Sequence, residues 1–319
     1  NNQIAELDVA TSENTIKESI AQIYIQILYA AESVRVNENT LQVSIAQRDR
    51  GQELLNAGSI AKSDLAQLEA QVSTDRYQLV TAQATLQDYK LQLKQLLELD
   101  GENEMNVYLP KLSDENVLAP LPTKKDVYVS ALAIRPEIEA SKLNVEASEL
   151  GIDIAKSSYF PTISLSAGIG TNHTSGSDFT FGEQVKNGWN NSFGLSVSVP
   201  IFNNRQTKSA VQKAKLQRET NMLSLLDEQK ALYKTIESLW LDANSAQQRY
   251  AAANEKLRST QISYDLISEQ FNLGMKNTVE LLTEKNNLLQ AQQEQLQAKY
   301  MAILNTQLLK FYQGDKLTL

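Results

Sequence analysis

The sequence predicts a mainly α-helical fold. Long antiparallel helical hairpins, of the coiled-coil or α-barrel type, form two structural repeats with a β-hairpin between them. Three observations predict it. Apolar side chains recur in helical steps along residues 209–311, and residues 1–100 repeat that pattern, including its turn. Between residues 159 and 202 the side chains instead alternate with a period of two.

The second repeat is predicted to be a hairpin of two very long helices. Residues 203–319 contain no proline, and their only glycines are Gly274 and Gly314. The expected turn is at Gly274, because glycine readily adopts the left-handed conformation that ends a helix. Asn277 is the expected cap of the returning helix, with Glu280 three residues later. At about 1.5 Å per residue, a run of about 65 residues reaches on the order of 100 Å, so these helices must pack as a coiled coil, a bundle or a wall.

The first repeat matches the second in a single register. Gly274 minus Gly58 is an offset of 216 residues, and without gaps it pairs apolar positions along both arms. The pairs include Ile20 with Ile236, Ala30 with Ala246, Leu41 with Leu257, Leu65 with Leu281 and Leu93 with Leu309, and Asp64 meets Glu280. One register across both arms and the turn predicts a structural duplication.

Five segments are predicted along the chain. Residues 1–100 form the first hairpin, with its turn near Gly58, and residues 101–124 are a connector carrying a short strand at Met105–Leu109. Residues 125–157 form a helix that Pro136 breaks or kinks. Residues 158–202 form the β-hairpin, and residues 203–319 form the second helical hairpin, with its turn near Gly274.

The two predicted strands carry an unusual polar face. In 159–170 and 193–199, large apolar side chains alternate with Ser, Thr and Gly, and a polar, glycine-containing loop (171–191) separates the runs. One interpretation is a sheet half-buried against a helix. The other is a pair of transmembrane β-barrel strands, because Tyr159, Phe160 and Phe202 gather at one end of the pair. The lipid-facing candidates are Ile163, Leu165, Ile169, Phe193, Leu195, Val197 and Val199.

Composition excludes several classes of function. The net charge of −8 and the lack of a basic cluster argue against a nucleic-acid partner. The absence of cysteine and the single histidine, His173 in the strand-to-strand loop, leave no catalytic triad, no metal site and no cofactor motif. We therefore expect no enzyme. No run of about 18 apolar residues is present. Because Asn1 begins within a helical pattern, the chain is expected to be a fragment or a processed product.

The order of these elements resembles the TolC family, the outer-membrane efflux channels of Gram-negative bacteria. The motifs that carry the resemblance are the Arg135-Pro136-Glu137 break, the Tyr159–Leu165 and Leu195–Asn203 strand segments, and the two turn glycines. It implies a homotrimer that forms a barrel in the outer membrane and a long periplasmic tunnel. The implied function is the exit duct of a tripartite efflux or type I secretion system, joined by a periplasmic adaptor to an inner-membrane pump. The family also has a helix and two strands before this point, so the N-terminal third is expected to be missing.

The resemblance also implies site residues. The periplasmic gate candidates are Ser63, Asp64, Phe271, Lys276 and Glu280, where Phe271 replaces a family Tyr and so lacks its hydroxyl. Three copies of the two acids would form a negative ring that favours cations, although both could simply be acids at helix starts. The adaptor-contact candidates are Ala57, Gly58, Ser59, Leu273, Gly274 and Met275, which could equally be ordinary tight turns. The competing function is a soluble periplasmic coiled-coil scaffold or adaptor whose β-hairpin packs on its own helices.

Overall fold

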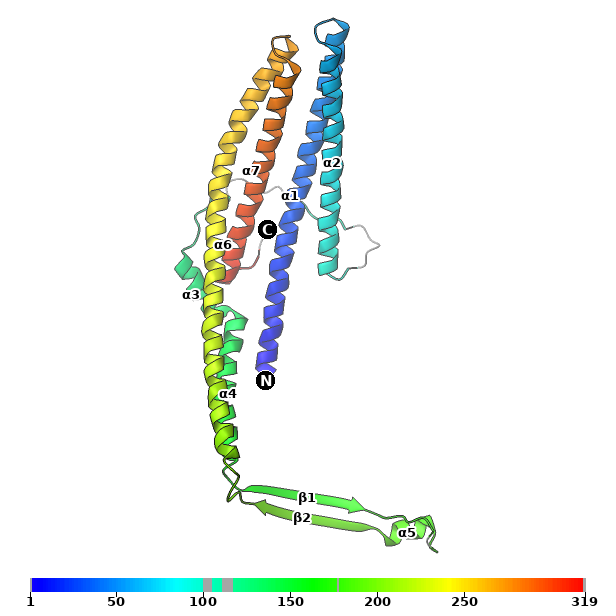
Figure 1. Ribbon diagram of the computed structural model, residues 1–319, viewed down its shortest axis with the longest axis vertical. Coiled ribbons are helices and arrows are strands. Elements are labelled where there is room, and N and C mark those ends of the chain that lie inside the picture. Colours follow the sequence, from blue (N-terminus) through cyan, green and yellow to red (C-terminus); the bar gives the residue numbers. More distant parts are fainter. Residues whose placement is uncertain (1, 100–104, 111–116, 177, 318–319) are drawn as a thin grey trace. The chain divides into compact units, whose positions relative to one another are not determined.

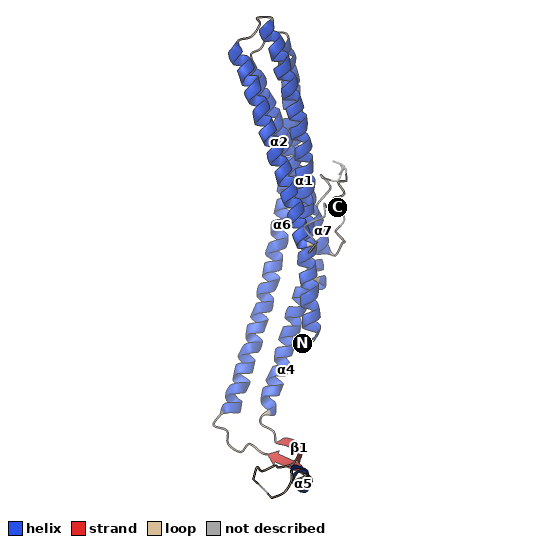
Figure 2. Cartoon of the chain, turned by 90° about the vertical axis from the view of Figure 1, so that its right-hand side faces the viewer, coloured by secondary structure: helices blue, strands red, loops and turns tan. Residues whose placement is uncertain are grey.

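The computed structural model describes residues 2–99, 105–110, 117–176 and 178–317, which hold two long helical hairpins and one β-hairpin. Figure 1 shows α1 beside α2 and the single two-stranded sheet, β1–β2, and Figure 2 shows how much of the chain is helical. The fold-class prediction is confirmed. The chain divides into two compact units. The first comprises Asn1–Glu139 with Gln229–Leu319, and the second comprises Ala140–Glu228. The elements are α1 (Asn2–Asn56), α2 (Lys62–Leu96), α3 (Lys124–Ile134), α4 (Pro136–Ser157), β1 (Thr162–Gly170), α5 (Phe181–Asn187), β2 (Asn190–Ser198), α6 (Gln206–Asn272) and α7 (Thr278–Gln313).

The two helical turns share one geometry. Helix α1 ends at Asn56 and α6 at Asn272, and 272 minus 56 is again 216. Gly58 and Gly274 have φ angles of 73° and 75°, in the left-handed region that glycine adopts without strain. The Ser59 and Met275 amides donate to the Leu54 and Gln270 carbonyls, each at 2.8 Å. This six-to-one hydrogen bond is the Schellman termination of a helix.

The connector does not contain the predicted strand. Residues 105–110 are described and form no strand. The Tyr108 carbonyl accepts a hydrogen bond of 2.7 Å from the Tyr24 hydroxyl. A lone segment against a helix has no neighbouring strand with which to form a ladder, so no strand forms here.

The Arg-Pro-Glu motif separates α3 from α4. Proline lacks an amide hydrogen, and its fixed φ suits the first position of a helix, so α4 begins at Pro136. Arg135 lies 3.0 Å from Glu18 and 2.7 Å from Glu137, and its guanidinium is 4.1 Å from the centroid of the Tyr312 ring. Burial, aided by the charge of Glu18 and opposed by Arg135, raises the pKa of Tyr312 to about 12. The motif therefore ties α1, α4 and α7 to one point.

A buried apolar cluster surrounds this point in the first unit. Val127 and Ala131 from α3 and Ile138 from α4 pack against residues of α6 and α7. The members from α6 and α7 are Leu232, Ile236, Ala243, Leu309 and Tyr312. Two of those five, Ile236 and Leu309, are apolar positions that the sequence repeat pairs with Ile20 and Leu93.

The strands pair antiparallel in a register that separates the two kinds of side chain. Ile163 faces Val197 and Leu165 faces Leu195, whereas Ser164 faces Ser196 on the opposite surface. The loop contains the short helix α5, which the sequence interpretation missed, and β2 begins at Asn190 rather than Phe193. Glu183 accepts hydrogen bonds from the Thr180 amide at 3.0 Å and from its hydroxyl at 2.8 Å, which stabilises the start of α5.

Candidate functional site

The second helical turn holds a charged capping arrangement. Glu280 accepts a hydrogen bond of 3.2 Å from the Asn277 amide and one of 2.5 Å from the Lys276 ammonium group. In return, the Asn277 side chain accepts from the Glu280 amide at 2.9 Å. The hydrogen bond from Lys276, with that from the Asn277 backbone, lowers the pKa of the Glu280 carboxyl group. Glu280 is therefore anionic and held at the start of α7.

The first turn repeats this capping with fewer charges. The Asp64 carboxylate accepts a hydrogen bond of 3.0 Å from the Ala61 amide. Among the described residues no ion pair joins Asp64 to Lys276, and Ser63 is exposed. Asp64 and Glu280 are thus both acids at helix starts, as one of the two interpretations expected.

Phe271 lies inside the protein rather than on an open surface. Its residue is 2% exposed, and it shares a buried cluster with Leu54, Leu68 and Leu281. These four residues come from α6, α1, α2 and α7. The side chain therefore joins both helical hairpins near their turns by apolar contact, and the hydroxyl that a tyrosine would bring is not needed for that contact.

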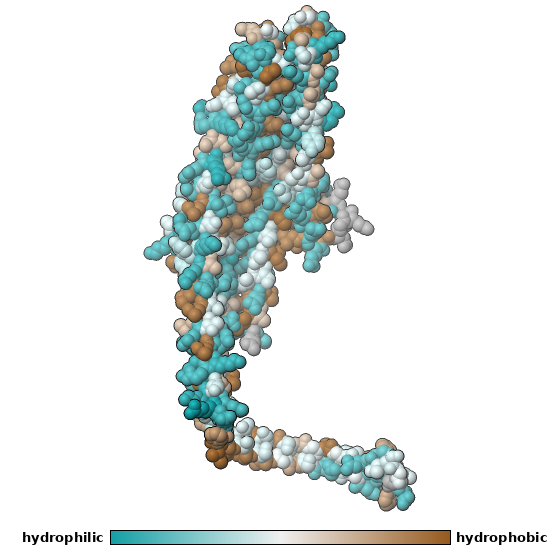
Figure 3. Space-filling model, in the orientation of Figure 1, coloured by the Kyte–Doolittle hydropathy of each residue, from teal (hydrophilic) through white to brown (hydrophobic). Residues whose placement is uncertain are grey.

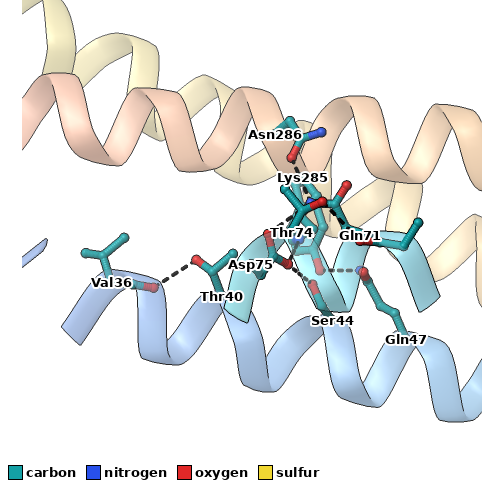
Figure 4. Close-up of polar contacts among 11 residues, drawn as sticks. Val36, Thr40, Ser44, Gln47, Gln71, Thr74, Asp75, Lys285 and Asn286 are labelled. Atoms are coloured by element: carbon teal, nitrogen blue, oxygen red, sulfur yellow. Dashed lines mark hydrogen bonds and ion pairs between the residues drawn. The ribbon is translucent and has the colours of Figure 1, made fainter. Parts of the chain in front are cut away.

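A buried polar cluster joins α1, α2 and α7, and the sequence interpretation missed it (Figure 4). Asp75 pairs with Lys285 and also accepts a hydrogen bond from Ser44. Gln71 donates to the other oxygen of Asp75 at 2.9 Å. Burial lowers the pKa of Lys285, while the hydrogen bond and charge of Asp75 oppose that shift. In the sequence, Asp75 continues the apolar stripe of Leu65, Leu68 and Val72 in helical steps. A charged residue at a position of an apolar stripe was the signal from which this buried cluster could have been predicted.

The strand hairpin exposes its apolar face. The seven lipid-facing candidates on β1, β2 and the residue after β2 are between 59% (Val197) and 84% (Phe193) exposed, and Figure 3 shows apolar groups along the hairpin. The only polar residue opposite one of them is Asn191, which faces Ile169 at the loop end. A contiguous exposed apolar face is a surface that binds lipid or protein, since water solvates it poorly.

The other face of the hairpin carries small side chains except at Asn190. It pairs Thr162 with Ser198, Ser164 with Ser196, Ser166 with Gly194, Gly168 with Ser192 and Gly170 with Asn190. A methyl group at Gly194 would lie 2.8 Å from the Ser166 hydroxyl oxygen, so the glycine makes room for its neighbour. This face is therefore polar and lacks large side chains.

Aromatic side chains border the apolar face at both ends. Exposed Tyr159, Phe160 and Phe202 lie beside the helix ends, and Phe179, Phe181 and Trp189 lie in the loop. Strands of nine residues span on the order of 30 Å at about 3.3 Å per residue, which matches the apolar thickness of a bilayer. The loop aromatics were not singled out from the sequence, because the loop was treated only as polar.

Within the described residues, no group of three or more His, Cys, Asp or Glu side chains is placed so that it could hold a metal ion. His173 lies 3.1 Å from the Gln184 side-chain oxygen and packs edge-on against Phe181. No helix among the described residues combines the length and hydropathy that crossing a membrane requires.

Comparison with known proteins assigns the family. The family model for Outer membrane efflux protein matches residues 127–314, more than half of the chain. The chain belongs to the outer membrane efflux protein family. Outer membrane efflux protein BepC of Brucella suis biovar 1 is 25% identical over 294 residues, covering 92% of this chain and 61% of BepC. Outer membrane protein TolC of Escherichia coli K12 is 25% identical over 315 residues, covering 95% of this chain and 62% of TolC.

Solved structures agree on the fold. A structure of CusC superposes with a TM-score of 0.81 at 18% identity, covering 98% of this chain and 71% of that one. At this identity the likeness shows the fold alone. The chain spans 61% of the length of its relative BepC and 62% of the length of its relative TolC.

Proposed function

We propose that the complete protein is the exit duct of a tripartite efflux or type I secretion system, with strands in the outer membrane and long helices in the periplasm. One observation carries the proposal: a hairpin with one large apolar face and one small polar face, both open to solvent in the single chain. Such a ribbon is stable where lipid meets one face and water the other. Membership of the outer membrane efflux family supports the same function.

The proposed barrel is closed by several copies of the chain. A two-stranded ribbon has two unpaired edges, and closure satisfies their amide and carbonyl groups within the membrane. We propose a homotrimer of the full-length protein, in which Ile163, Leu165, Ile169, Phe193, Leu195, Val197 and Val199 face outer-membrane lipid. The helical hairpins, predicted as residues 1–100 and 203–319, then form the tunnel.

Transport through this duct is proposed to be passive, without catalysis or a cofactor. An inner-membrane pump supplies the energy, and a periplasmic adaptor protein connects it to the duct. The proposed adaptor contacts are the turns Ala57-Gly58-Ser59 and Leu273-Gly274-Met275, which are supported by their exposure. Leu273 and Met275 are each 69% exposed, so the second turn offers apolar surface to a partner.

The proposed gate lies beside these turns, at Ser63, Asp64, Phe271, Lys276 and Glu280. Phe271 is proposed to act by packing, given its burial among Leu54, Leu68 and Leu281. Asp64 and Glu280 are proposed to set a negative potential at the pore entrance while they cap their helices. Lys276 offsets part of the charge of Glu280 through their ion pair.

Planar-bilayer recording of the full-length protein tests the proposal. We expect stable conductance after insertion and recovery of the protein in the outer-membrane fraction. Absence of conductance with recovery in the soluble periplasmic fraction would reject the duct and favour a coiled-coil scaffold or adaptor.

A second recording tests the acids alone. Asp64→Asn with Glu280→Gln removes both charges, while the amide oxygens still accept the capping hydrogen bonds. We expect weaker cation selectivity, and an unchanged reversal potential would remove these residues from the pore.

A further inference from the structure

The most enclosed ion pair of the described residues lies between the two helical hairpins. The side chains of Asp75 on α2 and Lys285 on α7 are 1% and 3% exposed, and 210 residues separate them. For comparison, the side chains of Lys256 and Glu294, which join α6 to α7, are 43% and 42% exposed. Burying two charges is costly, so their pairing must be maintained in the folded chain.

The pair is held from three helices. Ser44 on α1 donates to the Asp75 oxygen that Lys285 also contacts, and Gln71 on α2 donates to the second oxygen at 2.9 Å. Gln71 also reaches Asn286 on α7 at 3.5 Å. As Figure 4 shows, the carboxylate is thereby oriented toward α7. To keep this contact and the hydrogen bonds from Ser44 and Gln71 together, Lys285 must lie opposite the same carboxylate oxygen, since hydrogen bonds depend on direction.

The surface between α2 and α7 offers few other contacts that fix their relative position. Beside the pair lies a groove of about 290 Å³, lined almost entirely by Gln, Asn and Thr side chains of the two helices. Its lining residues are Gln71, Thr74, Gln78, Asn286, Leu289, Gln290 and Gln293. The Gln78 side-chain oxygen is buried and has no hydrogen-bond partner. This part of the seam is loosely packed and polar, so it resists sliding weakly.

Apolar contacts lie on both sides of this seam. Toward the turns is the cluster of Leu54, Leu68, Phe271 and Leu281, and away from them Ile25 and Leu28 of α1 pack against residues of α7. Apolar contacts are non-directional and tolerate small displacements. A displacement of α7 by one helical turn, about 5.4 Å, would instead separate Asp75 from Lys285 and leave both charges buried without a partner.

We infer that Asp75 and Lys285 are positioning residues that hold the α6–α7 hairpin in one axial register against the α1–α2 hairpin. The pair thereby sets the position of the turn at Leu273-Gly274-Met275 relative to the turn at Ala57-Gly58-Ser59. We further expect this register to set the resting state of the gate, and that expectation rests on the proposed function. The register itself does not depend on the proposed function.

Distance measurements on the full-length protein test the register directly. The chain has no cysteine, so Ser59→Cys with Met275→Cys places one spin label at each turn without background from this chain. Labelled subunits are diluted with unlabelled ones in lipid nanodiscs, and double electron–electron resonance gives the distance between the two labels. We expect a single narrow distance in the otherwise unchanged protein. Asp75→Asn or Lys285→Met should abolish that narrow peak.

Two further variants separate positioning from simple stability. The reversed pair Asp75→Lys with Lys285→Asp should restore a narrow distance. The apolar pair Asp75→Leu with Lys285→Met should fold but keep a broad distribution, because it packs without direction. The matched control Lys256→Met, which breaks an exposed pair within one hairpin, should leave the peak unchanged.

Some outcomes would overturn the inference. A wild-type distribution in the apolar pair, or in both single variants, would show that other contacts set the register. Conductance is recorded in parallel, and we expect Lys285→Met to increase the open fraction. If the unchanged protein conducts nothing, the duct proposal fails while the distance measurement still decides the register.

Discussion

Replacing Phe271 by alanine should loosen both helical hairpins near their turns. Phe271 is 2% exposed and contacts residues of three other helices, so its removal leaves a cavity shared by α1, α2 and α7. Truncation of a buried phenylalanine costs about 3–5 kcal/mol. Because the side chain lies at the end of α6, the loss should fall first on local opening of the turns rather than on the whole chain.

Native-state hydrogen exchange measures that loss. The Met275 amide, bonded to the Gln270 carbonyl at 2.8 Å, and the Ser59 amide of the other turn are the reporters. A loss of about 3–5 kcal/mol corresponds to exchange faster by on the order of 10²–10⁴-fold. The matched control is Leu273→Ala, two residues away and 69% exposed, which should change stability by less than about 0.5 kcal/mol. Equal exchange in the two variants would refute the view that Phe271 joins the hairpins by packing.

Three further outcomes are expected. Arg135→Met should cost about 3 kcal/mol in denaturant unfolding, because it leaves the partly buried carboxylates of Glu18 and Glu137 without their cation. Lys124→Met at a more exposed pair should cost about 1 kcal/mol or less, and similar losses in the two variants would contradict the role given to the motif. The pKa of Tyr312 is raised from 10.0 to about 12, so the folded state retains that proton after the unfolded state has lost it. Its contribution of about 3 kcal/mol is therefore present below pH 10 and lost as the pH rises toward 12. In Tyr312→Phe, the free energy of unfolding should not fall over this pH range. The same pH dependence of stability in the variant and the unchanged protein would contradict this role of Tyr312. Leu165→Lys should reduce assembly in the outer membrane, because a lysine on a lipid face costs about 2–4 kcal/mol. Ser164→Lys, on the opposite face, should not reduce assembly. A greater loss of assembly in Ser164→Lys would indicate that the Ser164 face, and not the Leu165 face, meets lipid.

Much of the architecture follows from local physics. Helical periodicity identified both hairpins, and the two glycines identified both turns, because a left-handed residue ends a helix wherever the chain lies. The alternation of 159–170 with 193–199 identified the strands, since side chains on a strand necessarily point to opposite faces. Even the capping roles of Asp64 and Glu280 depend only on residues three positions apart.

The failures of sequence interpretation have a shared cause. A strand at Met105–Leu109 was wrong because strands need a partner, and the sequence contained no sign that the neighbour was a helix. The helix α5 was missed because the loop was judged by its polarity rather than by the capping pair Thr180 and Glu183. In both cases a short segment was assigned without its context.

The sequence by itself determined the lengths of the helices, their turns, the faces of the strands and the resemblance to the outer membrane efflux family. Only the tertiary structure decided that Phe271 is buried and that Asp75 meets Lys285 across 210 residues. Periodicity shows which side of a helix is buried, because that depends on residues three and four apart. It does not show which helix covers that side, because the partner is chosen by packing between distant segments.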